Sequence, residues 1–394
     1  MTAVYLNAMG VVCALGQGAA AVRAGLFAPA PSGLVETTHY SPGRPLHLGC
    51  IPGDVPALPA TLPLRFQSRN NALLLAALAE LRAPVEAAIG RYGPTRVAVV
   101  LGISAAGLEE GARAARQLAA DGRWPADYDY AQQEMGNGAA FLAHALGIRG
   151  PSHVISTACS SSAKAMASAA RLLRAGFVDA VVTGGADALS AFTVAGFSAL
   201  DAVSAARCNP LSVNRSGINI GEAAALFLMT REAGPVRLAG WGESSDAHHM
   251  SAPEPTGRGA IAAMRQALAR ADIAPAQIDY VNLHGTGTQQ NDAMEALAVA
   301  EVLGCDVPTS STKPLTGHAL AAAGAVEAVL AWQTLVDNAA GLLPPHWWDG
   351  CRDPALAPIT AVAPGDSATR PPKYVLSNSF AFGGSNACLI LAGA

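Results

Sequence analysis

Short apolar runs alternate with helical patterns along most of this 394-residue chain, and this alternation limits the folds that the chain can adopt. The apolar runs predict buried strands, and the segments between them predict helices. Strands are predicted at 97–102, 178–184, 224–230, 236–242, 278–283, 374–379 and 388–392, and helices at 72–89, 163–173, 259–271, 294–303 and 319–336. Such alternation predicts an α/β protein with mainly parallel sheets covered by helices.

The chain is long enough for two domains, or for two halves that share one core. A polar turn at residues 231–235 separates two predicted strands near the middle of the functional part of the chain. We therefore predict an N-terminal half at residues 1–232 and a C-terminal half at residues 233–394. The segments 30–64 and 349–372 carry many Pro and Gly residues with little periodicity, which predicts irregular surface structure.

The composition predicts a large interior built from small side chains. Hydrophobic residues make up 51% of the chain, aromatic residues make up only 5%, and there are 40 glycines. Helices that pack tightly on sheets need such small residues, and a surplus of apolar residues also indicates surface that a second subunit covers. We therefore expect a homodimer or a heterodimer.

The charge and the cysteines argue against several functional classes. The net charge is −4 and no run of Lys or Arg is present, so nucleic-acid binding is not expected. The sequence shows no apolar stretch of about 20 residues and no signal-peptide pattern, which predicts a cytoplasmic protein without a membrane span. The seven cysteines lack metal-ligand spacing, so we expect reduced thiols, no metal and no cofactor.

One cysteine, Cys159, lies where a strand is predicted to end and the helix at 163–173 to begin. A thiol at the start of a helix feels the positive end of the helix dipole and nearby unpaired backbone N–H groups. Both effects favour the thiolate, so we expect the pKa of Cys159 to be lowered and the residue to act as a nucleophile. The alternative is a small buried cysteine that fills a gap in the core. This segment alone leaves both possibilities open.

Two histidines follow predicted strands or precede predicted helices. His284 lies at the end of the strand at 278–283, where open α/β sheets place their ligands, and the glycines at 285 and 287 allow a sharp loop. The glycine spacing does not fit a phosphate-binding or dinucleotide-binding loop. His318 immediately precedes the predicted helix at 319–336. Each histidine is a candidate for acid–base chemistry, and a structural role is the alternative.

A lysine, a glutamate and a glycine turn complete the candidate site. Glu327 lies among apolar residues of a predicted helix, where a buried carboxylate needs a cation, and we expect Lys313 to supply it. The alternative is a glutamate on an exposed helix face. Gly383 and Gly384 leave backbone N–H groups free to approach a ligand, as an oxyanion requires. A tight turn into the last predicted strand is the alternative for these glycines.

Taken together, these residues resemble the elongating β-ketoacyl-acyl-carrier-protein synthases, a family of condensing enzymes. The motifs at residues 157–161, 284–288, 313–318 and 380–386 occur in the order and spacing of that family. The resemblance covers almost the whole chain. It implies the α/β thiolase fold, with two similar halves in a layered α-β-α-β-α arrangement with mixed sheets.

The resemblance also implies roles for the candidate catalytic residues. Cys159 would carry the acyl chain as a thioester. His284 and His318 would serve the malonyl group as it loses carbon dioxide, and Lys313 with Glu327 would shape and polarise the site. Neutral imidazole N–H groups can stabilise the enolate that decarboxylation produces, which agrees with these roles.

The turn after the strand at 374–379 would complete this machinery. By resemblance, the N–H groups of Cys159 and Phe382 would form the oxyanion hole. Phe382, with Phe380 and Gly383, would gate the acyl pocket. Ala381 stands where the family commonly has a glycine, so a stiffer gate and slower substrate exchange are expected.

Several segments look closer to ketosynthases of aryl-polyene pigment clusters than to housekeeping fatty-acid enzymes; they are residues 69–72, 208–215, 217–222 and 242–253. A housekeeping ketosynthase for fatty-acid elongation remains the first alternative. The second is the chain-length-shaping subunit of a heterodimeric ketosynthase. Those subunits lack the nucleophile, whereas this chain keeps Cys159.

The family implies two partners. One is an acyl carrier protein, loaded with an acyl or a malonyl group, and its acidic surface would seek basic side chains. Our candidates for that docking surface are Arg65, Arg69 and Arg207. The other is a second ketosynthase subunit, either an identical chain or a chain-length-factor-like partner.

Overall fold

The computed structural model describes residues 2–394 and contains a 12-stranded mixed sheet. Eleven strands follow the order β12-β11-β10-β13-β14-β9-β1-β8-β7-β5-β6, and the twelfth, β2, pairs with β1. The strands of the first half are β1 (Tyr5–Cys13), β2 (Gly16–Gln17), β5 (Val97–Gly102), β6 (Ser152–Ile155), β7 (Ala180–Asp187) and β8 (Ala223–Thr230). Those of the second half are β9 (Val236–Ser245), β10 (Tyr280–Asn282), β11 (Pro308–Ser310), β12 (Thr360–Ala361), β13 (Tyr374–Ala381) and β14 (Ser385–Gly393). A separate hairpin pairs β3 (Val35–Thr37) with β4 (Leu46–Leu48).

The two halves repeat one strand order. The order β6-β5-β7-β8-β1 in the first half matches β11-β10-β13-β14-β9 in the second, and β1 pairs with β9 where the halves meet. Among these five strands of each half, three are parallel and the other two are antiparallel to their neighbours. The expectation of mainly parallel sheets is therefore wrong. The short turn between β13 and β14 is one reason, because so short a connection can join only antiparallel strands.

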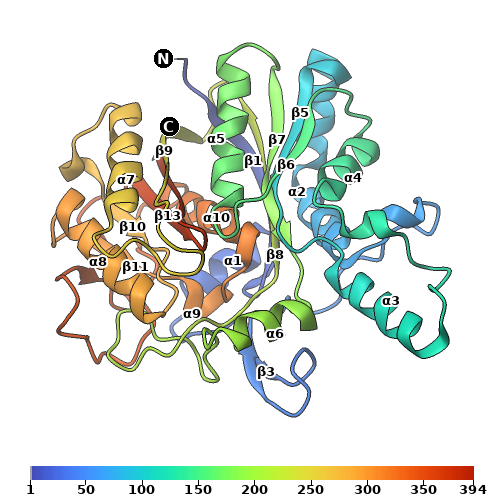
Figure 1. Cartoon of the computed structure of the whole chain (residues 1–394). Coiled ribbons are helices and arrows are strands. Elements are labelled where there is room, and N and C mark those ends of the chain that lie inside the picture. The colour runs from blue at the N-terminus through green and yellow to red at the C-terminus, as the bar shows by residue number, and fades with distance from the viewer. Residues whose placement is uncertain (1) are drawn as a thin grey trace.

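Helices lie between and outside the two halves of the sheet (Figure 1). They are α1 (Ala19–Leu26), α2 (Arg69–Tyr92), α3 (Leu108–Asp121), α4 (Asn137–Leu146), α5 (Ser161–Arg174), α6 (Ala191–Ala199), α7 (Arg258–Ala271), α8 (Gln289–Leu303), α9 (Lys313–Thr316) and α10 (Ala323–Leu335). In Figure 1, α5 and α10 occupy the middle, α2 and α4 lie on one side, and α7 and α8 lie on the other. This is the layered α-β-α-β-α arrangement.

The central layer carries the largest core. Small and branched apolar residues of α5 and α10, such as Ala165, Ala169 and Val329, are buried between the two halves of the sheet. Close packing here depends on glycines, which have no side chain. A methyl group added at Gly102 on β5 would overlap the backbone of Ser162 on α5. The glycine-rich composition thus allows α5 to approach the sheet, and α5 is the helix that follows Cys159.

All seven predicted strands and all five predicted helices are present, with ends that shift by a few residues. The segments predicted to be irregular contain regular structure, because residues 30–64 hold the β3–β4 hairpin and residues 349–372 hold β12. The turn at residues 231–235 joins β8 to β9. β1 of the first half pairs with β9 of the second half, so the sheet continues across residue 232. The division into domains at that residue stays a prediction.

Among residues 2–394, none of the helices has the length and hydrophobicity needed to cross a bilayer. The cytoplasmic location stays a prediction.

Candidate active site

Cys159 lies in a tight turn between β6 and α5. The preceding residue, Ala158, has a φ of 51°, a left-handed conformation that costs energy for a residue with a side chain. Two hydrogen bonds fix this turn: the N–H of Thr157 donates to Ser161 Oγ over 2.8 Å, and that hydroxyl donates to the carbonyl oxygen of Ala158 over 2.5 Å. The predicted junction of strand and helix is therefore present, and it holds the thiol in one direction.

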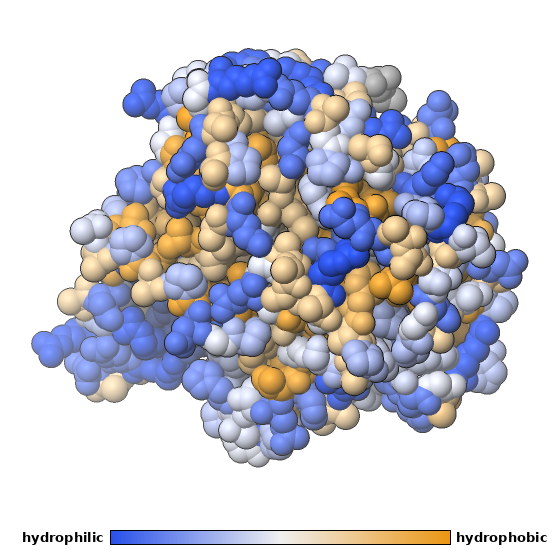
Figure 2. Space-filling model, turned by 180° about the vertical axis from the view of Figure 1, so that it is seen from behind, coloured by the Kyte–Doolittle hydropathy of each residue, from blue (hydrophilic) through white to orange (hydrophobic). Residues whose placement is uncertain are grey.

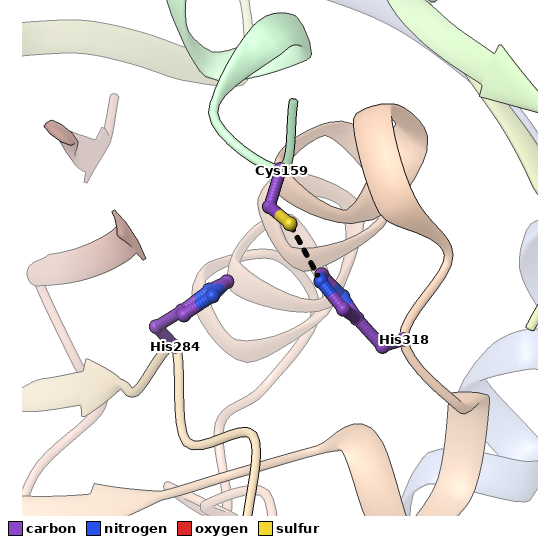
Figure 3. Close-up of side chains that lie close together, drawn as sticks. All are labelled: Cys159, His284 and His318. Atoms are coloured by element: carbon purple, nitrogen blue, oxygen red, sulfur yellow. Dashed lines mark hydrogen bonds between the residues drawn. The ribbon is translucent and has the colours of Figure 1, made fainter. Parts of the chain in front are cut away.

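Two imidazoles point toward this thiol (Figure 3). His318 Nε2 lies 2.9 Å from Cys159 Sγ. The centroids of the His284 and His318 rings are 5.3 Å apart, and the two rings are nearly perpendicular. All three side chains are buried, with relative exposures of 6% for Cys159 and 2% for each histidine. The structure thus brings together the three residues that the sequence predicted to act together.

Backbone hydrogen bonds fix the two histidines. His318 lies between α9 and α10, and its N–H donates to the carbonyl oxygen of Asn219 over 2.6 Å. His284 follows β10, and its N–H donates to Glu295 Oε1 over 2.7 Å. The N–H of Gly285 donates to the other oxygen of Glu295, also over 2.7 Å. One buried carboxylate on α8 thereby holds the loop that carries His284.

The predicted ion pair between Lys313 and Glu327 is present. Lys313 Nζ lies 2.5 Å from Glu327 Oε1, and the side chains are 2% and 3% exposed. Lys313 begins α9 and Glu327 lies within α10, so the pair joins the helices on both sides of His318. Buried charges of opposite sign need such a partner.

Both histidines are neutral at neutral pH. Burial lowers the pKa of His284 and of His318 well below the usual value, and the positive charge of Lys313 lowers both further. A neutral imidazole carries one N–H donor and one free nitrogen acceptor. The pair can therefore donate hydrogen bonds to a developing oxyanion and can also accept a proton.

The expected lowering of the Cys159 pKa is wrong. Burial raises the pKa of this thiol to about 12, although Lys313 and the backbone N–H groups of Phe382 and Cys159 act in the opposite direction. The start of α5 lies inside the protein, so loss of water outweighs the favourable dipole. Cys159 is consequently a thiol in the free site, and its proton needs an acceptor. His318 Nε2 lies in position to be that acceptor.

The turn between β13 and β14 borders the same thiol. The backbone N–H of Phe382 faces Cys159 Sγ, which is where an oxyanion hole would need it. The ring of Phe382 lies 5.8 Å from that of Phe197, and the ring of Phe380 lies 6.2 Å from that of His284. Gly383 has a φ of 82°, which favours glycine. The predicted gate residues therefore lie beside the site.

A cavity of about 540 Å³ leads to the histidines. Aromatic residues, including Phe380 and Phe382, line one part of it. Hydroxyl and amide side chains line another part: Ser216, Thr286, Thr288, Gln289, Asn291 and Asn386. The volume is large enough for an extended organic chain with hydrogen-bonding groups along its length.

Sequence reasoning missed two buried carboxylates near the site. Glu295 holds the His284 loop, and burial raises its pKa to about 7. The signal that found Glu327, an acidic residue among apolar helix residues, also applies to Glu295. Asp187 lies at the end of β7 and is fully buried. It follows directly on an apolar run, which is the signal that could have found it.

The three arginines proposed for docking differ in their surroundings. Arg69 forms an ion pair with the buried carboxylate of Glu222, and Arg207 donates to the backbone carbonyl oxygens of Ser32 and Pro314. These partners give both residues a structural role. Arg65 is exposed and lies over the ring of Phe66. Docking stays a prediction, and of the three guanidinium groups, that of Arg65 is the most accessible.

Cys159, His284 and His318 also have the donor types of a metal site. One donor atom from each lies within 4.8 Å of the others, and residues 2–394 contain no other such group. Lys313 is close enough to lower the pKa of both histidines, and the same positive charge opposes a metal cation. We therefore interpret the cluster as a nucleophile with two acid–base groups.

Comparisons with known proteins agree with this interpretation. The family models described as "Beta-ketoacyl synthase, N-terminal domain" and "Beta-ketoacyl synthase, C-terminal domain" match residues 68–234 and 236–346. The 3-oxoacyl-[acyl-carrier-protein] synthase 2 of Rhizobium meliloti is 37% identical over 62% of this chain and 61% of that protein. The mitochondrial 3-oxoacyl-[acyl-carrier-protein] synthase of Arabidopsis thaliana is 35% identical over 62% of this chain and 57% of that protein. The matches therefore span about three fifths of these relatives.

Solved structures match over the whole chain. The ketosynthase ApeO, solved in complex with its chain length factor ApeC from Xenorhabdus doucetiae, is 45% identical with a TM-score of 0.93, and the match covers 100% of this chain and 98% of that one. The ishigamide ketosynthase/chain length factor is 25% identical with a TM-score of 0.88, and the match covers 100% and 99% of the two chains. A type II polyketide ketosynthase, solved with its acyl-carrier protein, is 21% identical with a TM-score of 0.87, over 100% of both chains, which supports the fold alone.

Proposed function

The chain belongs to the β-ketoacyl synthase family, and we propose that it condenses malonyl-acyl-carrier-protein with an acyl chain bound to Cys159. The predicted family and the thiolase-like fold with a mixed sheet are confirmed. The observation that carries the proposed activity is the 2.9 Å contact between Cys159 Sγ and His318 Nε2, with His284 beside it in a buried site.

In the first half-reaction, Cys159 Sγ attacks the carbonyl carbon of an acyl thioester on the carrier protein. The thiol proton passes to His318 Nε2, and the N–H groups of Cys159 and Phe382 stabilise the tetrahedral oxyanion. The bond between the carbonyl carbon and the carrier sulfur then breaks, and the carrier thiolate leaves with the proton. The acyl chain is now a thioester of Cys159.

In the second half-reaction, the malonyl thioester oxygen accepts N–H hydrogen bonds from His284 and His318. The bond to the carboxylate breaks, carbon dioxide leaves, and the electron pair forms an enolate on the thioester. The enolate carbon attacks the acyl carbonyl on Cys159. The carbon–sulfur bond breaks, the cysteine sulfur takes a proton from solvent, and the β-ketoacyl chain remains on the carrier. Burial, together with the positive charge of Lys313, lowers the pKa of both histidines and keeps them neutral for this role.

The substrate that we propose is an aryl-polyene chain or a related polyketide or fatty-acid chain. The resemblance of residues 69–72, 208–215, 217–222 and 242–253 to aryl-polyene ketosynthases supports this choice. The 45% identity to the ketosynthase ApeO over the whole chain is consistent with it. Housekeeping elongation of saturated chains is the alternative, and the similarity to 3-oxoacyl-[acyl-carrier-protein] synthases supports that choice instead. A chain-length-shaping subunit is the second alternative, and the intact set of Cys159, His284 and His318 argues against it.

We propose two partners, an acyl carrier protein and a second ketosynthase subunit. ApeO was solved with a chain length factor, and this supports a heterodimer of the same kind. The surface has apolar patches among hydrophilic residues (Figure 2). Several large apolar side chains are exposed, among them Trp124, Tyr130, Phe177 and Phe192. Contiguous apolar patches on a surface are typical of regions that another subunit covers.

Intact-protein mass spectrometry tests the function. The chain is offered carrier proteins loaded with saturated, polyenoyl or aryl-enoyl groups, and the Cys159→Ala variant serves as the control. Selective acylation of Cys159 by unsaturated or aryl chains would support aryl-polyene elongation, whereas a preference for saturated chains would support fatty-acid elongation. Acylation that occurs only with a second subunit present would support the heterodimer, and equal acylation of the control would contradict the assignment of the nucleophile.

A further inference from the structure

Asp187, at the end of β7, is fully buried and accepts four hydrogen bonds. Its Oδ1 accepts from the N–H groups of Ser104 and Ala105, each over 2.8 Å. Its Oδ2 accepts from the Ser104 hydroxyl over 2.5 Å and from the N–H of Ala321 over 2.8 Å. Within residues 2–394, no lysine, arginine or histidine forms an ion pair with it. A buried carboxylate without a cation is costly, so its donors must compensate for the lost water.

These four bonds join two segments that are far apart in the sequence. Ser104 and Ala105 follow β5 in the first half, whereas Ala321 belongs to the short turn Leu320–Ala322 that begins two residues after His318. Leu320 in this turn has a φ of 50°, which is unfavourable for a branched side chain. A turn with such strain persists only where its surroundings hold it. The hydrogen bond that the Asp187 carboxylate accepts from the N–H of Ala321 is one of the contacts that keep this turn in place.

The carboxylate also acts on the nucleophile through its charge. Asp187 is close enough to Cys159 to raise the pKa of the thiol, whereas Lys313 lowers it. The other titratable groups that face the sulfur are His284 and His318, which are both neutral at neutral pH. The negative charge of Asp187 therefore favours the protonated thiol in the free enzyme.

We propose that Asp187 is a positioning residue for proton transfer from Cys159 to His318. Its carboxylate fixes the turn that follows His318, and its negative charge adds to the effect of burial on the thiol. The effect on turnover rests on the proposed function, whereas the effect on the thiol does not.

Asp187→Asn separates this role from simple core packing. The substitution keeps the size of the side chain and removes its charge. If the amide oxygen keeps the two N–H groups of Ser104 and Ala105, the amide nitrogen faces the N–H of Ala321, and two donors cannot bond to each other. The variant therefore loses the hydrogen bond to the turn that follows His318 and keeps the hydrogen bonds to Ser104 and Ala105.

The test measures alkylation of Cys159 by iodoacetamide across a pH series, with the modified cysteine identified by mass spectrometry. Removing the negative charge should move the pH of half-maximal alkylation to a value about one unit lower in Asp187→Asn. Turnover with malonyl-carrier and acyl-carrier substrates should fall roughly 10- to 100-fold with little change in KM, because the proton acceptor is displaced. A general loss of structure would also make this buried thiol more acidic, because it would expose the thiol to water. The circular dichroism spectrum and thermal unfolding of Asp187→Asn are therefore compared with those of the wild type, and the alkylation result counts only for the folded variant.

The matched control is Asp279→Asn. Asp279 also fixes a loop, since it accepts the N–H groups of Lys373 and Tyr374, but it precedes β10 and so lies at the other end of this strand from His284. It should leave the alkylation profile unchanged. If Asp187→Asn does not fold, Ser104→Ala removes the hydroxyl bond to Oδ2 and should give a smaller fall in turnover at unchanged KM.

An alkylation profile of folded Asp187→Asn that equals the wild-type profile overturns the proposal. Wild-type turnover in a folded Ser104→Ala variant would also count against it. Alkylation is measured without substrate, so this experiment keeps its meaning even if none of the offered carriers supports condensation. Failure of the proposed function and failure of this inference are thereby distinguished.

Discussion

At Lys313 and Glu327, two opposite charges lie 2.5 Å apart with almost no exposure to water. Each charge loses its hydration on folding, and the partner compensates for that loss. The pair also influences the chemistry, because the positive charge of Lys313 adds to burial in lowering the pKa of His284 and of His318. At the scale of single residues, structural stability and acid–base function therefore depend on the same contact.

Glu327→Gln should destabilise the protein by roughly 3–5 kcal/mol, because it leaves the Lys313 ammonium buried without a counter-charge. Urea denaturation followed by circular dichroism measures this difference. The control is the double variant Lys313→Met with Glu327→Gln, which removes both charges. It should recover much of the loss in stability while turnover stays low. A double variant that is less stable than Glu327→Gln would contradict this account.

At the scale of elements, glycines determine how closely helices approach the sheet, because they have no side chain. Gly242 on β9 faces α7, and an added methyl group would overlap the carbonyl oxygen of Ala263. Gly90 near the end of α2 has open space around the same position. It also has a φ that any residue adopts, since it is absent from the residues with positive φ. Replacing these two glycines with alanine should therefore have opposite effects on the stability of the protein.

Gly242→Ala should destabilise the protein by about 1–3 kcal/mol, because strand and helix must move apart. Gly90→Ala should stabilise it by about 0.5–1 kcal/mol, because alanine loses less backbone entropy in a helix. Thermal unfolding of the two variants beside the wild type measures both effects. The same sign of shift in both variants would refute the explanation by packing.

The same scale shows what the sequence could and could not predict. β5 and β8 were found because all of their residues are buried, which produces continuous apolar runs. β1 was missed because Asn7 and Gly10 interrupt its apolar pattern, although it joins the two halves. The β3–β4 hairpin was missed because Leu46 and Leu48 are buried by contacts with distant segments, which no local pattern records.

The candidate site follows the same rule. Cys159, His284 and His318 could be found because each lies at the end of a strand or the start of a helix within a distinctive motif. The raised pKa of Cys159 could not be found, because the sequence indicates the start of a helix and not the depth at which it is buried. Asp187 was missed because its partners lie 82 to 134 positions away along the chain.

At the scale of the whole molecule, the site belongs to neither half alone. Cys159 follows β6 in the first half, and His318 follows β11 in the second, and these two strands hold equivalent places in the repeated strand order. Each residue also precedes a helix of the central layer, α5 or α10. The repeat therefore brings the nucleophile and its proton acceptor to the middle of the molecule from opposite sides. Contacts that tie the halves together should accordingly affect both stability and activity.

His346 is one such contact, and it makes the stability of the whole molecule depend on pH. It is buried, its Nδ1 accepts the N–H of Ser311 over 3.0 Å, and its Nε2 lies 3.0 Å from the carbonyl oxygen of Pro210 in the first half. Burial lowers its pKa from 6.5 to about 4. The unfolded chain therefore binds a proton at this residue between pH 6.5 and about 4 where the folded protein does not, so the stability contribution is lost as the pH falls through that range.

The two pKa values differ by about 2.5, which corresponds to about 3 kcal/mol. Asp187 and Glu295 act in the opposite direction, because their raised pKa values favour the folded state at low pH and that benefit is lost as the pH rises toward 6 and 7. Both carboxylates are present in the variant and in the wild type, so their contributions cancel when the two free energies of unfolding are subtracted.

His346→Gln should be less stable at pH 7.5, and its stability should fall by about 3 kcal/mol less than that of the wild type between pH 7 and pH 4. Urea denaturation at each pH measures this, with His144→Gln on the exposed face of α4 as the matched control. Parallel pH curves for His346→Gln and the wild type would mean that the imidazole has the same pKa in the folded protein as in the unfolded chain, which would contradict this account.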